Sequence, residues 1–321
     1  MEATNRRPSE RLLQRAHASR DELVERIAQV VRGDGTVEPL PGLQLYRASA
    51  PTGLAHGVSF PSLCLVAQGS KELRLGDNRY RYNPAQYLIS TVSLPIATWI
   101  SEASPERPYL GLVLRLDQSL VGSVLVEASQ RAPRNATAVT AIDVSPLDAN
   151  LLDVVVRLIR LLDSPTDVSF LAPMVKREIV YRLLRGAQGD RLHQIAAVGG
   201  TTHRITEAIE RLRKDFDQPL YIEDLAREYG MSVSGFHHHF RALTTMSPLQ
   251  YQKQLRLQEA RRLMVGEGLD AASAGHRVGY GDASQFTREY KRLFGAPPMR
   301  DMEQLREGAG NRALQEAARG Q

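Results

Sequence analysis

Three adjacent histidines, His237, His238 and His239, are the residues whose type most suggests metal chemistry. They lie in the stretch SVSGFHHHFRALTTMS, residues 232–247, whose apolar spacing is helical. On an α-helix successive side chains point about 100° apart, so three neighbours cannot converge on one ion. Helical metal pairs need a spacing of three or four residues. The sequence therefore predicts no metal site here, and the stretch must be interpreted from its surroundings.

A second chemically distinctive residue is Cys64, the only cysteine in 321 residues. A single cysteine excludes an internal disulfide framework and fits a reducing, cytoplasmic compartment. In SFPSLCLVAQG, strand alternation puts Cys64 on one face with Ser62 and Val66. Leu63 and Leu65 take the other face. Two interpretations stay open, a small buried hydrophobe or a thiolate that reacts with an electrophile such as a reactive aldehyde.

The elements around these residues suggest a β-rich regulatory domain. Residues 9–32 have helical periodicity and predict an N-terminal helical arm, 1–35. Between 42 and 116, short β-favouring runs such as SLCLVAQ and YLGLVLRL alternate with turn formers. Closely spaced short strands predict a cupin-like β barrel or a double-sheet jelly roll. This domain is expected to span 36–187.

Two amphipathic helices, NLLDVVVRLIRLLDS and PMVKREIVYRLLRG, are expected within about 146–187. They could cover the core of their own domain or pair with a second subunit as a homodimer, and both alternatives stay open. Residues 188–200 contain AQGD and VGGT and are expected to be a linker. The predicted fold class is α+β, with the β domain followed by an all-α domain.

The last third of the chain contains an internal repeat. Phe236, Phe240 and Leu243 have the i, i+4, i+7 spacing of one buried helical stripe. The same spacing recurs later at Phe286, Tyr290 and Leu293. Each stripe follows a short helix, a glycine and a tight turn, which predicts two helix-turn-helix units over 201–300. A helical tail is expected at 301–321.

The most specific stretch is RVGYGDASQFTREYKRLFGAPP, residues 277–298, with a Gly-aromatic turn, an aromatic-basic helix and a Gly-x-Pro-Pro stop. With its repeat, it resembles the DNA-binding domain of the AraC family of bacterial transcription regulators. The run SLCLVAQGSKELRLGD resembles, less specifically, an N-terminal regulatory domain of that family. The resemblance implies a cytoplasmic, effector-sensing DNA-binding regulator, commonly an activator. It also implies double-stranded promoter DNA and RNA polymerase as partners, and neither enzymatic activity nor a cofactor.

In a helix-turn-helix the second helix enters the major groove and its outward residues meet base edges. The expected base-contacting residues are Ser234, His237, His238, Ser284, Gln285 and Arg288. The expected phosphate-contacting residues are Arg241, Thr287, Lys291 and Arg292. In the family the position of His238 often carries arginine, so a different readout is expected there. His239 is expected to lie on the packed side.

The β domain is expected to bind a small-molecule effector, because apolar side chains with polar tips are typical of ligand sites. The candidate pocket residues are His56, Cys64, Tyr87, Trp99 and Tyr109. One alternative is a cupin-type metalloenzyme fused to a DNA-binding domain, but 36–145 contains a single histidine. Another is an effector-independent architectural DNA-binding protein.

Global composition is compatible with these predictions but does not require them. The formal net charge of +5 permits an acidic partner such as nucleic acid. No apolar run reaches the length of about 18 residues expected of a membrane span. The N-terminal residues have no apolar core of the signal-peptide type. Export and membrane insertion are therefore not expected.

Overall fold

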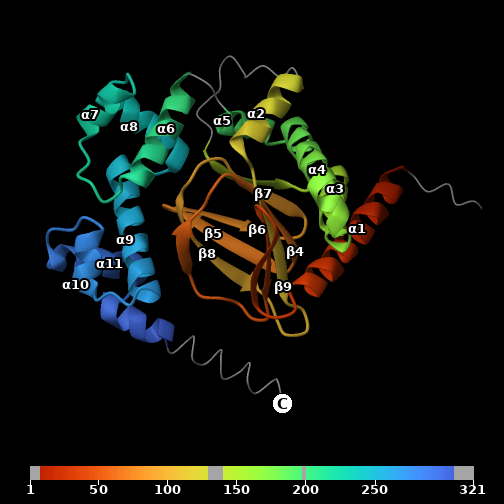
Figure 1. Ribbon diagram of the computed structural model, residues 1–321, viewed down its shortest axis with the longest axis horizontal. Coiled ribbons are helices and arrows are strands. Elements are labelled where there is room, and N and C mark those ends of the chain that lie inside the picture. The colour runs from red at the N-terminus through yellow and green to blue at the C-terminus, as the bar shows by residue number, and fades with distance from the viewer. Residues whose placement is uncertain (1–7, 129–139, 197–199, 307–321) are drawn as a thin grey trace, which may run out of the picture. The chain divides into compact units, whose positions relative to one another are not determined.

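The computed structural model describes residues 8–128, 140–196 and 200–306 (Figure 1). The parts of the expected arm, regulatory domain, linker and tail that lie outside these ranges are 1–7, 129–139, 197–199 and 307–321. Two compact units divide the chain, residues 1–207 with 238–245 and residues 208–237 with 246–321. We call the strands and helices between 8 and 196 the β domain, and the helices between 200 and 306 the helical domain.

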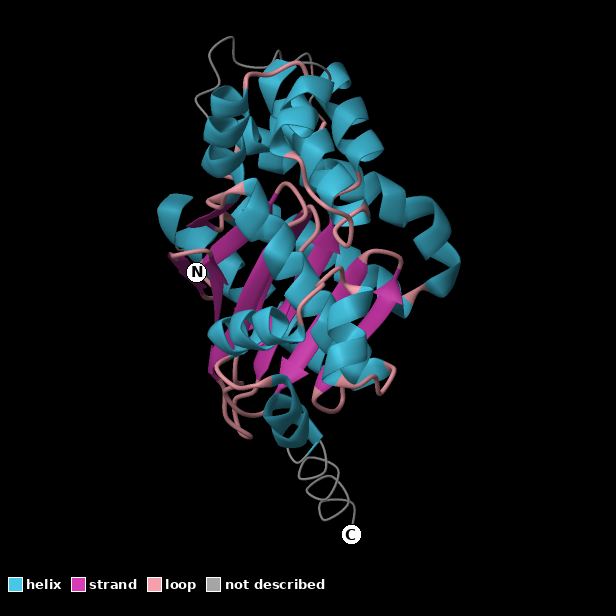
Figure 2. Cartoon of the chain, turned by 90° about the vertical axis from the view of Figure 1, so that its left-hand side faces the viewer, coloured by secondary structure: helices cyan, strands magenta, loops and turns pink. Residues whose placement is uncertain are grey.

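The β domain contains a six-stranded and a four-stranded antiparallel sheet, drawn in magenta in Figure 2. The strand orders are β1-β2-β9-β4-β7-β10 and β3-β8-β5-β6. Both sheets keep free edges, so the domain is jelly-roll-like and not a closed barrel. The α+β fold class is confirmed. The strands are β1 (Gly35–Leu40), β2 (Leu43–Ala48), β3 (Ala55–Val58), β4 (Ser62–Gln68), β5 (Ser70–Leu75), β6 (Asn78–Tyr82), β7 (Gln86–Ser90), β8 (Pro95–Glu102), β9 (Tyr109–Arg115) and β10 (Ile142–Pro146).

Helices cover the outer face of the six-stranded sheet. They are α1 (Pro8–Val30), α2 (Gln118–Glu127), α3 (Ala149–Arg160), a 3-10 turn η1 (Leu161–Asp163), α4 (Pro165–Arg185) and α5 (Gly189–Ile195). The expected helical arm is therefore part of this domain's core, since Leu23 and Ile27 of α1 are fully buried. The structure also differs from the expected linker at 188–200, where the buried side chains of Leu192 and Ile195 join the same core.

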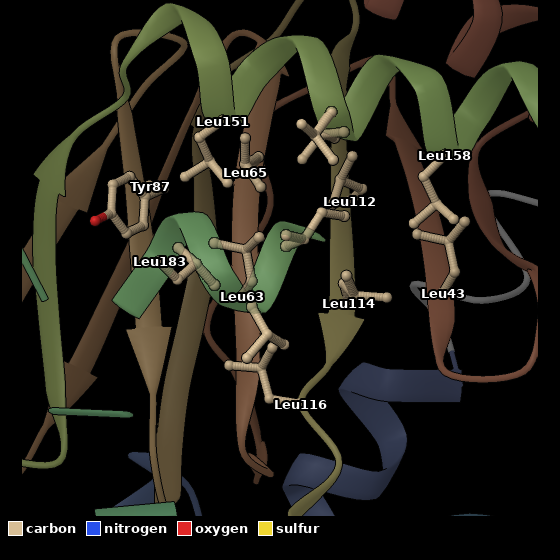
Figure 3. Packing of buried hydrophobic residues seen from close by; sticks show 14 of the residues in the cluster. Leu43, Leu63, Leu65, Tyr87, Leu112, Leu114, Leu116, Leu151, Leu158 and Leu183 are labelled. Atoms are coloured by element: carbon tan, nitrogen blue, oxygen red, sulfur yellow. The ribbon is translucent and has the colours of Figure 1, made fainter. Parts of the chain in front are cut away.

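The main hydrophobic core lies between this sheet and its helices (Figure 3). Alternate strand residues such as Leu63 and Leu112 point toward the helices, where they meet Leu151 of α3 and Leu183 of α4. Each buried leucine contributes roughly 1.5–3 kcal/mol. The opposite strand face carries Cys64 and turns toward the four-stranded sheet. The predicted alternation in β4 is thus confirmed.

The helical domain consists of helices and tight turns. Its helices are α6 (Gly200–Lys214), α7 (Ile222–Glu228), α8 (Val233–Thr244), α9 (Pro248–Gly266), α10 (Ala271–Arg277), α11 (Ala283–Phe294) and a last helix over 298–306. Ser247 caps α9 together with Gln250, and Pro248 occupies its first turn. Both features are typical helix starts.

Candidate nucleic-acid interface

Two helix-turn-helix units with the same local geometry occupy the helical domain. The turn after α7 contains Gly230 at φ 62°, and the turn after α10 contains Gly279 at φ 88°. In both turns the N–H of the residue after the glycine donates to the carbonyl five residues back, at 2.8 Å and 3.0 Å. A Cβ at Gly279 would lie 2.1 Å from the carbonyl oxygen of Asp217, so only glycine fits there. The predicted repeat is confirmed.

Helix α8 is the second helix of the first unit. The Ser232 hydroxyl accepts a hydrogen bond from the backbone N–H of Gly235 at 3.1 Å and so starts the helix. The predicted inward stripe is buried at Phe236, Phe240 and Leu243. Among the predicted DNA-contacting residues Ser234, His238 and Arg241 are exposed and His237 is half-buried. His239 is also half-buried, and its ring packs edge-on against that of His238 with centroids 5.1 Å apart.

Helix α11 is the second helix of the second unit. The Asp282 carboxylate accepts from the backbone N–H of Ser284 at 2.8 Å, and Gly295 ends the helix at φ 85°. Phe286 and Tyr290 are fully buried, as predicted. The opposite face is exposed at all six predicted contact residues, Ser284, Gln285, Thr287, Arg288, Lys291 and Arg292. Helical spacing alone therefore separates a packed face from a polar face.

The cations on α11 differ from three of the exposed arginines elsewhere in the helical domain. Among the described residues, Arg288, Lys291 and Arg292 have no carboxylate within ion-pair distance. By contrast, the exposed arginines Arg227, Arg262 and Arg277 are all paired with carboxylates. Because the α11 charges are not neutralised within the protein, they are available to phosphate groups.

A half-buried carboxylate, that of Glu289, holds α11 in place. Glu289 accepts hydrogen bonds from Lys253 of α9 at 2.8 Å, from the Tyr280 hydroxyl at 2.8 Å and from Gln285 at 3.2 Å. Burial alone would raise the pKa of Glu289, but the bonds from Lys253, Tyr280 and Gln285 outweigh it and lower that pKa. Glu289 thus fixes both the helix and the predicted base-contacting Gln285. Sequence analysis did not identify this role.

Arg256 of α9 ties the loop after α6 to the turn of the second unit. Its guanidinium donates to the carbonyl oxygens of Phe216, Asp217 and Gln218 at 2.6–3.1 Å. A further bond, 3.0 Å long, goes to the carbonyl of Gly279. Backbone carbonyls that would otherwise lack partners are satisfied by one side chain. This contact fixes the turn from which α11 starts.

The predicted effector residues of the β domain do not form one group. Cys64 and Tyr109 lie on the face of the six-stranded sheet that turns toward the other sheet. Tyr87 instead belongs to the core under the helices (Figure 3). Strand register places His56 and Trp99 on the outer face of the four-stranded sheet, and Arg79 lies 5.1 Å from the Trp99 ring centroid. Only two of the five candidates lie on the inner face, because residue type does not reveal strand orientation.

The inner face contains polar residues that sequence analysis missed. Lys71 of β5 extends toward the other sheet, and its Nζ lies 5.3 Å from the ring centroid of Tyr46 on β2. Tyr82 of β6 is buried directly opposite Lys71. The signal was available in SKELRL, where Lys71 alternates in phase with the buried Leu73 and Leu75.

Two other kinds of site are absent from the described residues. No three His, Cys, Asp or Glu side chains in that part of the chain gather as metal ligands. Within the same residues, no helix combines the length and apolarity needed to cross a membrane.

Two family models match the chain. The model of the AraC-type transcriptional regulator N-terminus matches residues 39–191, and a model of the helix-turn-helix domain matches residues 225–304. Together they span more than two thirds of the chain. Among the strands and helices described above, the first match covers the β domain from the end of β1 onward, and the second covers α8 to α11.

Curated relatives are similar at lower coverage. The chain is 25% identical to the transcriptional regulator ArgR of Pseudomonas aeruginosa over 140 residues, which is 43% of each chain. It is 27% identical to the activator RhaS of Klebsiella pneumoniae over 104 residues, 32% of this chain and 37% of RhaS. The aligned region thus spans about two fifths of these two relatives. With the activator NphR of Rhodococcus it is 26% identical over 250 residues, 74% of this chain and 68% of NphR.

Solved structures of ToxT from Vibrio cholerae share the fold. Apo ToxT superimposes with a TM-score of 0.52 at 9% identity, over 81% of this chain and 97% of ToxT. ToxT with an unsaturated fatty acid bound gives the same TM-score and identity, over 81% and 94% of the chains. Such low identity shows the fold alone. With an AraC-type N-terminal domain followed by a helix-turn-helix domain, this chain belongs to the AraC family of transcription regulators.

Proposed function

We propose that the protein is a sequence-specific regulator of transcription that binds double-stranded promoter DNA through α8 and α11. One observation supports this most, the repeated helix-turn-helix with a packed stripe on one side and exposed polar or unpaired basic residues on the other. In this role the outward residues of α11 enter the major groove, where Arg288 contacts guanine and Gln285 contacts adenine. Lys291 and Arg292 bind phosphates, which positions the helix without reading sequence.

The relatives indicate how such a regulator acts. RhaS and NphR are named activators, so we propose that this protein activates transcription in the cytoplasm by contacting RNA polymerase. The β domain serves as a binding module and not as an enzyme. This assignment is supported by the described residues, among which no His, Cys, Asp and Glu side chains gather as a metal-ligand set.

Lys291→Ala should weaken binding to every DNA duplex by a similar factor. The reason is that an exposed, unpaired lysine on α11 contributes charge but no base readout. Fluorescence anisotropy titrations at several salt concentrations should show a slope of log affinity against log salt smaller in magnitude by about one.

The matched control is Arg262→Ala on α9. Arg262 is also exposed, but Glu259 and Glu267 neutralise it. Its loss should leave DNA affinity unchanged. Equal effects of the two substitutions would mean that general charge, and not the face of α11, governs binding.

We further propose that the regulator is a homodimer joined through α4. One face of α4 is buried in the β-domain core at Ile179, Val180 and Leu183. Another face exposes large apolar side chains, Phe170, Leu171, Met174 and Tyr181, with Phe170 68% exposed. A stripe of this size on one helix is typical of a protein–protein contact, and a two-fold pairing buries it on both subunits. Both alternatives predicted from the sequence then apply to α4. One face of the helix packs in the core of its own domain, and another face packs against a second subunit.

The double substitution Phe170→Ser with Met174→Ser should shift the protein toward monomer. Both side chains contribute apolar area to the proposed interface and little to the core, so the fold should persist. Sedimentation velocity across a range of protein concentrations measures the shift. Val126→Ser on α2 is the control, because Val126 is 80% exposed but lies outside the α4 face. A wild type that stays monomeric at all concentrations would contradict the proposal.

The β domain is proposed to sense a small-molecule effector, as ToxT binds a fatty acid. A covalent adduct of a reactive aldehyde with Cys64 is the sharper alternative, but it requires a thiolate. Burial raises the pKa of Cys64, and the lowering effects of Lys71 and the Ser62 hydroxyl do not offset it. The structure therefore favours a noncovalent effector. An architectural protein without an effector would need no polar interior.

A further inference from the structure

The space between the two sheets contains a lysine without a counter-ion. Lys71 shares its face of β5 with the buried Leu73 and Leu75. Its neighbour Glu72 points to the other side, where Arg79 pairs with it. Among the described residues, no carboxylate lies within ion-pair distance of Lys71 Nζ and no group forms a hydrogen bond with it. Its near neighbours there are the Tyr46 ring and the Cys64 thiol.

An unpaired interior amine is energetically unfavourable. Burial lowers the pKa of Lys71, since the charged form loses its hydration, and the nearby Cys64 offsets this only in part. The Tyr46 ring favours the ammonium through its negative face, but such a contact is weaker than an ion pair. A bound anion would supply the missing partner.

Two buried phenol hydroxyls, which like Lys71 interact with Cys64, also lack partners among the described residues. Tyr82 and Tyr109 are 2% and 3% exposed, and neither hydroxyl has a hydrogen-bond partner in the part of the chain that the structure describes. Tyr109 folds over Gly111, whose missing side chain makes room, because a Cβ there would lie 2.4 Å from the Tyr109 hydroxyl. Burial raises the pKa of both tyrosines, so they remain hydrogen-bond donors.

A pocket borders the strand β2 that carries Tyr46. The Lys71 side chain is half-buried, whereas Tyr82 and Tyr109 are buried. A pocket of about 450 Å³ opens nearby, and Gln44 forms part of its wall. Gln44 accepts a hydrogen bond from the Tyr46 hydroxyl at 2.5 Å, and Lys71 Nζ lies over the ring of the same tyrosine.

We propose that Lys71, Tyr82 and Tyr109 form the anion-binding end of the effector site, and that the effector is a small organic carboxylate. The ammonium and the two hydroxyls offer only donors, and no carboxylate of the described residues competes for Lys71. A carboxylate accepts several hydrogen bonds and supplies a negative charge to pair with the Lys71 ammonium, whereas a neutral ligand leaves Lys71 without a counter-ion. The proposal rests on the proposed effector-sensing role of the β domain and is independent of DNA binding.

Calorimetric titration of the full chain tests the proposal without DNA. The probes are straight-chain carboxylates of increasing length, benzoate and phenylacetate, each compared with its neutral amide. We expect the wild type to bind at least one carboxylate roughly tenfold or more tightly than the matching amide, since charged hydrogen bonds exceed neutral ones. Lys71→Met should lose this preference. Binding of no carboxylate, or an unchanged preference in Lys71→Met, overturns the assignment.

Lys176→Met is the matched control. Lys176 lines the 450 Å³ pocket and donates to the carbonyl of Pro41, so it is a nearby cation outside the proposed site. The carboxylate preference should survive its loss. A preference that disappears in Lys176→Met and persists in Lys71→Met would place the anion in the outer pocket and refute the proposal.

A second measurement needs no ligand. Lys71→Met keeps the length of the side chain and removes an unpaired interior amine, so the variant should resist urea at least as well as the wild type. A clear loss of stability would mean that Lys71 serves the fold and not a ligand. DNA affinity of the effector-free variant should be unchanged, which separates failure here from failure of the DNA-binding proposal.

Discussion

Asp301→Ala should destabilise the helical domain by about 3–5 kcal/mol, the usual cost of removing one partner of a buried ion pair. Asp301 accepts two hydrogen bonds from Arg261 of α9, at 2.8 and 2.9 Å, and a third from the Tyr290 hydroxyl at 2.7 Å. The Asp301 side chain is 7% exposed and that of Arg261 is 18% exposed. The substitution leaves the arginine charge and the hydroxyl without a partner. Because Tyr290 lies on the packed stripe of α11, the damage reaches the proposed recognition helix.

Urea unfolding followed by two probes measures this effect. The single tryptophan, Trp99, lies in the β domain and reports on that domain, whereas circular dichroism reports on all helices. The helical transition should move to lower urea, while the tryptophan transition should move less. Glu259→Ala is the control, because it breaks an exposed pair with Arg262 and should change neither transition. Replacing Arg261 and Asp301 together by apolar residues should recover much of the stability. An Asp301→Ala protein as stable as the wild type would contradict this account.

Arg288→Ala should reduce affinity for the specific DNA site by about 5- to 150-fold, which corresponds to roughly 1–3 kcal/mol for a bidentate base contact. Arg288 is exposed on α11, and no carboxylate of the described residues pairs with it. The loss should concentrate at one base pair, so a site mutated at that pair should bind the variant and the wild type equally.

Anisotropy titrations with the specific site and its single-base variants measure this change. Lys291→Ala is the comparison, because it should weaken all of these duplexes alike. If Arg288→Ala lowers the affinity for every duplex by the same factor, Arg288 contacts phosphate and the assignment of the base-reading face is wrong.

Local periodicity explains why the helical domain could be predicted from sequence. Phe236 and Phe286 mark buried stripes because a helix repeats every 3.6 residues, and that rule needs no knowledge of distant contacts. Gly230 and Gly279 signal the turns for the same local reason. The two helix-turn-helix units differ by one residue in spacing. Gly230 and Gly279 are 49 residues apart, whereas Phe236 and Phe286 are 50 residues apart. The second turn therefore contains one more residue.

The interior of the β domain could be predicted only in part. Alternation placed Cys64 correctly opposite Leu63, but both faces of a strand between two layers can be buried. Residue type was therefore a poor guide to the effector pocket. Trp99 packs on an outer face with Arg79, and Tyr87 packs under the helices. Lys71 was overlooked because a charged residue in a strand usually faces solvent. Its orientation depends on the pairing of β5 with β6 and β8, which are long-range contacts.

The residues that hold α11 in place could not be predicted from the sequence either. Asp301 reaches Arg261 across 40 residues, and Glu289 meets Lys253 of another helix. In the sequence, each of these residues looks like an ordinary charged surface residue. Only the packed structure shows that its side chain is shielded from solvent. Positioning residues of this kind carry no sequence signal comparable to the apolar stripes.

In vitro selection from a random duplex library tests the central claim most directly, because it needs no knowledge of the natural promoter. The account predicts one enriched motif with two short blocks whose centres lie about one helical turn, 10–10.5 base pairs, apart, one for each helix-turn-helix. Selection with Arg288→Ala should retain both blocks and lose preference at a single position of one of them. Enrichment of no motif, or the same motif with undiminished preference in Arg288→Ala, would contradict sequence-specific recognition through α11.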